Sequence, residues 1–297
     1  MSSYDRLVAY RRMQPRAPRL DRQTVRARGI SFAVFSTPPV AGSPPLMAIN
    51  GGMLFDHGML WPALAPLAAT RQLILFDLRG RGESSAPASP DDASIENDAA
   101  DVAAIRRAIG VRQMDLLGHS WGGGIAMLAA VTDQPAIRRL ILVDAVGPTS
   151  DWIPQLRRNA IERLRGELRN RLERIDENAL ASPDPEIHAE QTQAIYPAWF
   201  ADPDLAEKFT LPRVVNPTGA TVLARLRAQH YDWRRELSVL RTPTLVIHGA
   251  LDPLPVETSL EIVATLPNAH HTLIPDAGHM PFWEAPDVFF PLVEKFL

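Results

Sequence analysis

The chain has 297 residues, of which 46% are hydrophobic and 22% are charged. These values are typical of globular proteins and exclude extended disorder. The net charge of −3 gives no electrostatic reason to expect nucleic acid or an anionic membrane as a partner, and the absence of cysteine excludes disulfides.

No apolar stretch approaches the roughly 18 residues that a membrane span needs, and no signal-peptide pattern follows the N-terminus. We therefore expect a soluble, cytoplasmic protein with a small-molecule or short peptide-like substrate. The arginine-rich segment 6–28 is expected to lie as an amphipathic arm on the core surface. The sequence leaves the oligomeric state open.

Short apolar runs alternate with helical stretches in the first half of the chain. The runs predicted as strands are 30–35, 46–50, 73–76, 114–117 and 140–143. The last four are largely apolar, which suits strands covered on both faces. A helix is predicted over 98–109, with Gly110 as its stop. This alternation predicts an α/β fold with a mostly parallel, doubly wound sheet.

The alternation fails between 148 and 236. Apolar residues recur at helical spacing over 153–175, which predicts one long amphipathic helix. Shorter helical pieces follow near 204–209 and 218–229. Strand-like runs resume at 244–247 and 271–274, and a closing helix is predicted over 286–296. We therefore expect a core formed by 1–147 and 237–297, with an inserted helical cap over 148–236.

The segment Gly118-His119-Ser120-Trp121-Gly122 matches the pattern G-x-S-x-G between a predicted strand and a helical run. A serine hydroxyl becomes a useful nucleophile when a tight turn exposes it and a base accepts its proton. Glycines two residues before and after the serine let the helix and the neighbouring strand approach. Ser120 is therefore the candidate nucleophile, and His119 is expected to serve packing.

A base and an acid follow in the order Ser, Asp, His. Asp252 and His279 each come in a loop just after a predicted strand, where active-site residues of open α/β sheets gather. Asp144 also ends a strand and is a rival acid. The adjacent pair His270-His271 would face opposite sides of a strand, so no metal site is predicted, and no cofactor is implied.

The backbone N–H groups of Gly52 and Trp121 are the candidate oxyanion hole. Gly52 lies in Asn50-Gly51-Gly52-Met53 at the end of an early strand, and Trp121 follows the nucleophile. Gly51, next to Gly52, is expected to line the substrate site.

With these motifs in place, the chain resembles the α/β-hydrolase superfamily. Asp77-Leu78-Arg79-Gly80-Arg81-Gly82-Glu83-Ser84 is similar to its D-x-R-G-x-G-x-S loop, and the region from Gly278-His279 to Trp283-Glu284 is similar to its C-terminal histidine region. Within the superfamily the sequence is most similar to proline iminopeptidases, as in 56–67 and Ser120-Trp121-Gly122-Gly123. The resemblance implies an α/β-hydrolase core and removal of an N-terminal aminoacyl group through an acyl-enzyme.

The chain departs from the iminopeptidase pattern at three places. Asn50 replaces the usual histidine, Met53-Leu54 replaces Pro-Gly, and His119 replaces a frequent glycine. Iminopeptidases hold the substrate ammonium with glutamates, but Pro253 follows Asp252 here and no cap glutamate matches theirs. The departures bear on the substrate and leave the acyl-transfer residues in place.

Aromatic residues of the cap are candidate substrate contacts. We expect Trp152, Trp199, Phe200 and Tyr231 to line an apolar tunnel above the nucleophile, although ordinary packing between cap helices explains them equally well. A tunnel would suit a bulky hydrophobic amine, such as a biosynthetic intermediate, that carries an aminoacyl group.

The sequence therefore predicts a serine amidohydrolase or aminopeptidase of the proline iminopeptidase type. An esterase, a lactonase or a carbon–carbon bond hydrolase with the same triad is the alternative. A non-enzymatic receptor that retains the triad is a third hypothesis.

Overall fold

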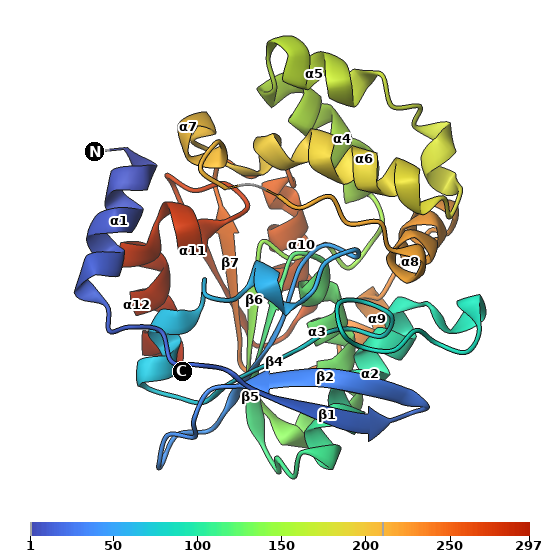
Figure 1. The fold of residues 1–297 in the computed structure, drawn as a ribbon. Helices are drawn as coiled ribbons and strands as arrows, with labels where there is room; N and C mark the ends of the chain where they lie inside the picture. The colour runs from blue at the N-terminus through green and yellow to red at the C-terminus, as the bar shows by residue number, and fades with distance from the viewer. Residues whose placement is uncertain (1, 210) are drawn as a thin grey trace.

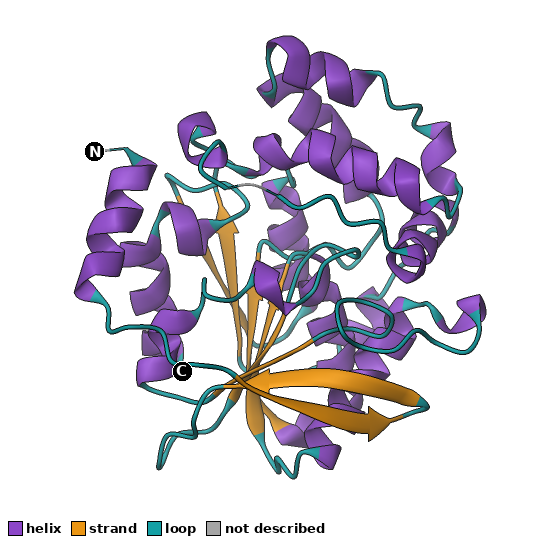
Figure 2. Ribbon diagram, viewed as in Figure 1, coloured by secondary structure: helices purple, strands orange, loops and turns teal. Residues whose placement is uncertain are grey.

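The computed structural model describes residues 2–209 and 211–297. Its centre is an eight-stranded sheet in the order β1-β2-β4-β3-β5-β6-β7-β8 (Figures 1 and 2). The pairs β1–β2 and β2–β4 are antiparallel, and the remaining pairs are parallel. The mostly parallel sheet predicted from the sequence is confirmed. The strands are β1 (Asp21–Ala27), β2 (Ile30–Ser36), β3 (Leu46–Ile49), β4 (Leu73–Phe76), β5 (Met114–His119), β6 (Ile137–Val143), β7 (Thr244–Gly249) and β8 (Ala269–Ile274).

Helices cover both faces of the sheet because the central strands are buried on both sides. On one face, α2 (Ile95–Ala108), α3 (Trp121–Thr132) and α10 (Val256–Thr265) pack side chains such as Val102, Ile125 and Ile262 into one core. On the other face, α1 (Ser3–Met13), α11 (Pro281–Glu284) and α12 (Pro286–Phe296) contribute Leu7 and Phe289 to a second core. The sheet therefore separates two hydrophobic layers.

The N-terminal segment differs from the arm expected on the surface. Ser2 caps α1 by accepting a hydrogen bond from the N–H of Asp5, and the ring of Tyr10 stacks on Phe290 of α12. The segment then forms β1, an edge strand in which only Val25 is buried. An edge strand with one buried side chain lacks the apolar run by which strands are predicted, and this explains why β1 was not foreseen.

The chain leaves the sheet after β6 and returns to it at β7. The intervening segment forms the cap, which lies above the carboxyl ends of the strands in Figure 1. Its helices are α4 (Trp152–Arg163), α5 (Gly166–Glu173), α6 (Pro185–Ile195), α7 (Pro203–Ala206), α8 (Pro217–Ala228) and α9 (Arg234–Leu237). Helices α4 to α8 lie within the segment 148–236, and α9 ends one residue beyond it. The exact boundaries between core and cap stay a prediction.

Short 3₁₀ helices connect several of these elements. They are η1 (His57–Met59), η2 (Ala65–Ala69), η3 (Pro90–Asp92), η4 (Gln134–Ala136), η5 (Asn178–Ala181) and η6 (Tyr196–Trp199).

The single helix predicted over 153–175 is wrong. The structure has two helices there, because α4 ends at Arg163, the next residue Leu164 has an extended backbone, and α5 begins at Gly166, whose φ is +54°. A positive φ is readily adopted by glycine and cannot continue a right-handed helix. The sequence pattern does not reveal this break, because apolar residues recur at helical spacing on both sides of it. Both helices bury such residues in one cap core, for example Ala160 of α4 and Leu172 of α5.

Candidate active site

Ser120 occupies a strained turn between β5 and α3. Its φ of +54° and ψ of −121° lie outside the regions that residues with a side chain favour. The turn is held on both sides, because the Ser120 N–H donates to the Val143 carbonyl and the Ser120 carbonyl accepts from Gly123 and Val146. This geometry places the serine at the floor of a cavity beneath the cap.

The two glycines of the motif are required by close backbone contacts. A Cβ added at Gly118 would lie 2.3 Å from the carbonyl oxygen of Gly122. A Cβ added at Gly122 would lie 2.3 Å from the carbonyl oxygen of Ile49 in β3. Any side chain at either position would therefore push α3 away from β3 and β5 and reshape the turn that carries Ser120.

His279 and Asp252 come together from loops that follow neighbouring strands. Asp252 lies after β7 and His279 after β8, and the Nδ1 atom of His279 is 2.7 Å from Oδ2 of Asp252. His279 lines the same cavity as Ser120. The structure thus pairs the proposed acid with the proposed base and places the base and Ser120 on the lining of one cavity.

Both members of the His279–Asp252 pair are shielded from water. Burial lowers the pKa of His279 from 6.5 to about 3 and raises the pKa of Asp252 above its usual range. An imidazole with a lowered pKa is neutral at pH 7, and a neutral imidazole is the form that can accept a proton from a serine. His279 is therefore in the protonation state that a general base needs at pH 7.

The rival acid Asp144 lies beside this pair at the end of β6. Its Oδ1 accepts a hydrogen bond from the Gly249 N–H at 2.7 Å, while its Oδ2 is buried without a hydrogen-bond partner among the described residues. Carboxylate and imidazole atoms of Asp144, Asp252 and His279 all lie within 4.8 Å of one another. Asp252, however, makes the hydrogen bond to Nδ1 of His279. Burial, with the adjacent Asp252, raises the pKa of Asp144 well above its usual range.

His119 packs behind His279, as expected, but it also reaches the cavity. Its Nε2 donates to the carbonyl oxygen of His279 at 2.8 Å, and its ring packs edge-on against Phe282. Burial lowers the pKa of His119 to about 3, so the ring is neutral. The residue before the nucleophile therefore holds the backbone of the candidate base.

The loop after β3 lies against the nucleophile. A Cβ at Gly51 would be 2.7 Å from the Cβ of Ser120, and Gly52 has a φ of +71°. The side-chain amide of Asn50 donates to the carbonyls of Gly51 and Phe55 and closes this loop. Asn50 thereby fixes the backbone of Gly52, whose N–H is a candidate oxyanion donor. The second candidate, Trp121, begins α3, where N–H groups have no partner within the helix.

Arg81 supports this loop from beneath. Its guanidinium is fully buried, donates to the Met53 carbonyl and forms two hydrogen bonds with Asp98. Arg79 makes a similar pair with Asp101. Both arginines belong to the loop whose sequence resembled the superfamily motif. The motif therefore acts here by anchoring the backbone beside Ser120.

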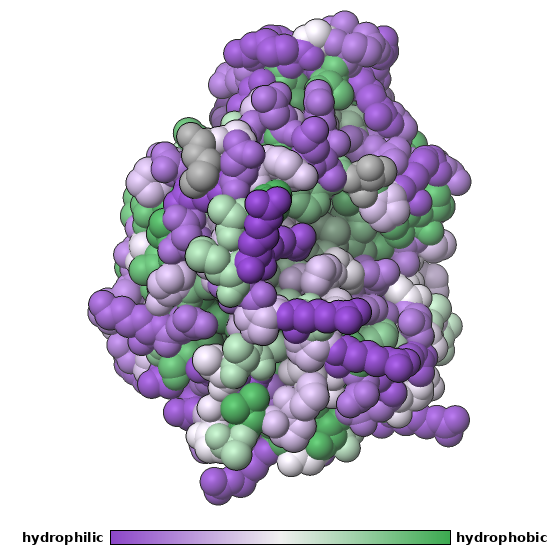
Figure 3. Space-filling model, turned by 60° about the vertical axis from the view of Figure 1, so that its left-hand side comes forward, coloured by the Kyte–Doolittle hydropathy of each residue, from purple (hydrophilic) through white to green (hydrophobic). Residues whose placement is uncertain are grey.

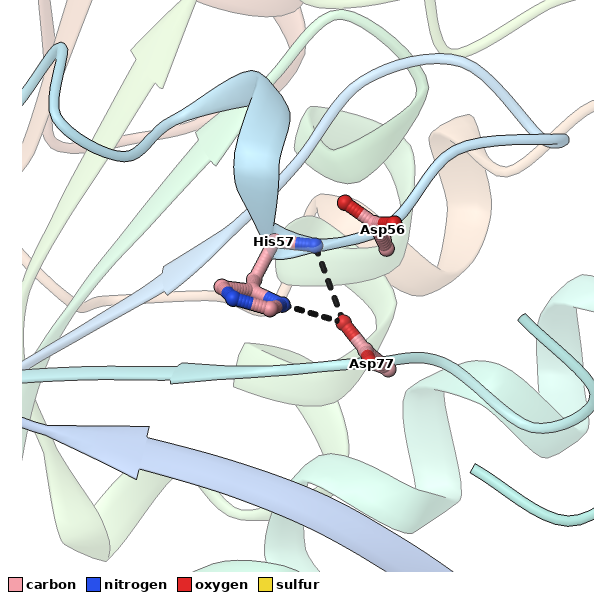
Figure 4. Close-up of side chains that lie close together, drawn as sticks. All are labelled: Asp56, His57 and Asp77. Carbon is pink, nitrogen blue, oxygen red and sulfur yellow. Dashed lines mark hydrogen bonds and ion pairs between the residues drawn. The ribbon is translucent and has the colours of Figure 1, made fainter. Parts of the chain in front are cut away.

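Asp77, in the same motif, forms further hydrogen bonds beside the loop after β3 (Figure 4). Its Oδ1 accepts from the backbone N–H of His57 and lies 2.8 Å from Nδ1 of the same residue, while its Oδ2 accepts from the Glu83 N–H. Asp56 caps the short helix η1 by accepting a hydrogen bond from the Gly58 N–H. Through these bonds, both oxygens of Asp77 hold the segment that follows the loop after β3.

The cap closes the cavity with mostly apolar side chains, and Figure 3 shows a hollow with hydrophobic groups on one side of the molecule. Gly51, Trp152 and Trp199 line the cavity, as the sequence predicted. Trp199 packs directly on His279, with ring centroids 4.0 Å apart.

Two aromatic residues lie outside the lining, contrary to the sequence prediction. Phe200 points into the core, where it stacks on Phe209. Tyr231 stacks on Trp233 and accepts a hydrogen bond from the indole of Trp152, so it supports a lining residue from behind. Composition alone cannot tell which face of a cap helix an aromatic side chain occupies.

Two arginines of the cap line the cavity and were not anticipated. Arg157 lies on α4 and Arg227 lies on α8. No aspartate or glutamate is among the described residues that line the cavity. The abundance of arginine in the sequence made these two positions hard to recognise, since other arginines form surface ion pairs, such as Arg22 with Glu83 and Arg169 with Glu173.

Residues 44–286 match the family model described as alpha/beta hydrolase fold. The chain belongs to this family. As an alpha/beta hydrolase, it is 24% identical over 268 residues to a proline iminopeptidase of Heyndrickxia coagulans, a match that covers 86% of this chain and 91% of that protein. The resemblance to the family that the motifs indicated is thus confirmed.

Solved structures of other hydrolases have the same fold. A proline iminopeptidase of Mycobacterium smegmatis superposes with a TM-score of 0.72 at 21% identity, covering 93% of this alpha/beta hydrolase and 97% of that chain. A thermophilic esterase of Thermogutta terrifontis superposes with a TM-score of 0.65 at 26% identity, covering 93% and 97%. No helix among the described residues is long and apolar enough to cross a bilayer.

Proposed function

We propose that this alpha/beta hydrolase cleaves a carboxylic ester or amide through an acyl-enzyme on Ser120. The observation that carries the proposal is the 2.7 Å contact between Asp252 and Nδ1 of His279, in a cavity whose floor holds Ser120 in a strained turn. Three groups from separate loops with these chemistries are the minimal set for acyl transfer.

The reaction proceeds in two halves. The Ser120 hydroxyl attacks the substrate carbonyl while His279 takes its proton, and the N–H groups of Gly52 and Trp121 stabilise the oxyanion. His279 then protonates the leaving alcohol or amine. A water molecule attacks the acyl-enzyme by the same route and releases the acid. Asp252 orients the imidazole throughout.

The first substrate class is an aminoacyl amide, as in a proline iminopeptidase. It is favoured by the curated relatives, which share about a quarter of their residues with this chain over most of its length. Such a substrate carries an ammonium group near the scissile bond. A hydrophobic amine bearing an aminoacyl group would place its apolar part against Trp152 and the neighbouring cap side chains.

The second class is an ester, or a lactone, without a positive charge, and the chemistry of the cavity fits this class better. Arg157 and Arg227 line the cavity, and no carboxylate of the described residues lines it with them. An ammonium group would lose its hydration there without gaining an anionic partner, which is costly in an apolar site. A carbon–carbon bond hydrolase would use the same catalytic residues.

A matched pair of chromogenic substrates separates these classes. We expect turnover of p-nitrophenyl butyrate with a burst of p-nitrophenol, and much weaker turnover of L-prolyl-p-nitroanilide. The Ser120→Ala variant should lose about four or more orders of magnitude in turnover. Labelling of Ser120 by a fluorophosphonate, read by mass spectrometry, is the independent check. Absence of both labelling and turnover would reject acyl transfer and leave a receptor, whereas fast release of proline would restore the aminopeptidase.

A further inference from the structure

The charged residues that line the cavity, Arg157 and Arg227, belong to the cap, as do His188, Gln191 and Thr192, and this group is called the polar end. Three cap helices carry it, and each of them also carries apolar lining residues. On α4, Leu156 is followed by Arg157, and on α8, Leu226 is followed by Arg227. On α6, His188 and its neighbours Gln191 and Thr192 precede the apolar turn at Ile195.

Helix lengths show how far apart the two ends lie. Tyr196 and Trp199 form the turn that packs beside His279, and His188 lies eight residues before Tyr196, which is about 12 Å of helix. Gly219 packs against the carbonyl of Met53 in the loop after β3. Arg227 lies eight residues further along α8, which is also about 12 Å of helix. A group held at the polar end is therefore remote from the scissile carbonyl.

Arg157 is buried and incompletely bonded. Only 7% of the residue is exposed. Its Nη2 donates to the carbonyls of Leu172 and Ile175, but its Nη1 has no hydrogen-bond partner among the described residues. A buried guanidinium nitrogen without an acceptor is costly unless a ligand supplies one.

Arg227 adds a second positive charge at the same place. Both guanidinium groups approach a single carboxylate, Glu177, at 3.9 and 4.0 Å, and more than half of the Glu177 side chain is exposed. Neither approach is a hydrogen bond. Burial lowers the pKa of Arg227, as does the neighbouring charge of Arg157, while Glu177 acts in the opposite direction. The polar end is thus short of negative charge.

We propose that Arg157 and Arg227 bind a carboxylate that the substrate carries at the far end of its acyl chain. This inference rests on the proposed acyl hydrolase function, and it specifies the substrate as the ester of a dicarboxylic acid. Guanidinium groups bind carboxylates through paired hydrogen bonds. Gln191 and Thr192 provide uncharged polar surface beside them. The apolar middle of the cavity would hold the methylene chain.

Kinetics with half-esters test the charge requirement. The substrates are p-nitrophenyl hydrogen suberate, with a free carboxylate, and p-nitrophenyl methyl suberate, in which that carboxylate is capped. We expect kcat/KM to be about tenfold or more higher for the free acid, the effect of a hydrogen bond to a charged group. Adipate and sebacate analogues would locate the best chain length.

Arg227→Gln is the informative variant because the Arg227 side chain holds no described backbone group, whereas Arg157 anchors the cap. We expect Arg227→Gln to remove most of the preference for the free acid, measured within the variant as the ratio of kcat/KM for the free acid to kcat/KM for the capped ester. Arg227→Lys keeps the charge and should retain part of the preference. The control on the same helix is Arg225→Gln, whose side chain bonds Asp91 and the Ala93 carbonyl outside the cavity and should not change the preference.

Direct binding distinguishes failure of this inference from failure of the hydrolase function. The Ser120→Ala variant should bind monomethyl suberate more tightly than dimethyl suberate by calorimetry, and Arg227→Gln should abolish the difference. If neither ester is hydrolysed but the half-ester still binds preferentially, the anion site stands and the hydrolase proposal falls. Hydrolysis and binding without any preference for the free acid would overturn the anion site alone.

Discussion

The backbone and the side chain of Trp199 both contact His279. The N–H of His279 donates to the Trp199 carbonyl at 2.7 Å, and the two rings pack with centroids 4.0 Å apart. The same carbonyl lies so close to Gly278 that a Cβ there would be 2.5 Å from it. A residue of the cap thus helps to position the candidate base of the core. The cap therefore both encloses the cavity and contributes to the geometry of the catalytic residues.

Removing the Trp199 ring should impair catalysis more than folding. We expect Trp199→Ala to lower kcat/KM about tenfold to a hundredfold, because small misplacements of a catalytic group are costly. Trp199→Phe keeps a ring and should lose less. Steady-state kinetics with p-nitrophenyl butyrate, accompanied by thermal melting, checks this. Full activity in Trp199→Ala would mean that the backbone contact alone positions His279.

The acidic limb of the pH profile should lie well below pH 6.5. Burial lowers the pKa of His279 to about 3, so the imidazole stays neutral and able to accept a proton as the pH falls through the ordinary histidine range. We expect kcat/KM, which reports the free enzyme, to change little between pH 7 and about pH 5. In Trp199→Ala, exposure of His279 should move the limb toward pH 6.5. A wild-type limb centred near pH 6.5 would contradict the shielding argument.

Substitutions of the two acids should have unequal effects. Asp252 accepts from Nδ1 of His279, whereas Asp144 accepts from the Gly249 N–H. We expect Asp252→Asn to lower kcat by about four orders of magnitude, since an amide there favours the wrong tautomer. Asp144→Asn can keep the bond to Gly249 and should cost less than about tenfold in the same assay. A larger loss from Asp144→Asn would reassign the triad acid.

Arg81 should matter for stability far more than a surface arginine. Arg81→Met would leave the Asp98 carboxylate buried without its partner, and we expect a loss of about 3–5 kcal/mol in the free energy of unfolding. Arg169→Met, which breaks an exposed pair with Glu173, is the control and should cost less than about 1 kcal/mol. Urea denaturation measures both. Adding Asp98→Leu to Arg81→Met should recover part of the loss, and no recovery would point to the bond with Met53 instead.

Local patterns predicted most of the core. The run 73–76 and the closing helix 286–296 have the predicted bounds, because their apolar periodicity is strong and their ends carry clear signals. The edge strand β1 was missed because a strand that buries one side chain has no such pattern. The break between α4 and α5 was missed because both helices bury apolar residues in the same cap core, so the apolar periodicity continues across the break.

The sequence by itself determined which residues could take part and in which order. The glycines around Ser120, the serine, and the acid and histidine that follow later strands are properties of short segments and of strand order. Tertiary structure decided that Asp252, rather than Asp144, contacts His279, and that Arg157 and Trp199 face the cavity while Phe200 and Tyr231 do not. Those choices depend on packing between segments far apart in the chain, and local composition carries no information about which side of a helix such packing covers.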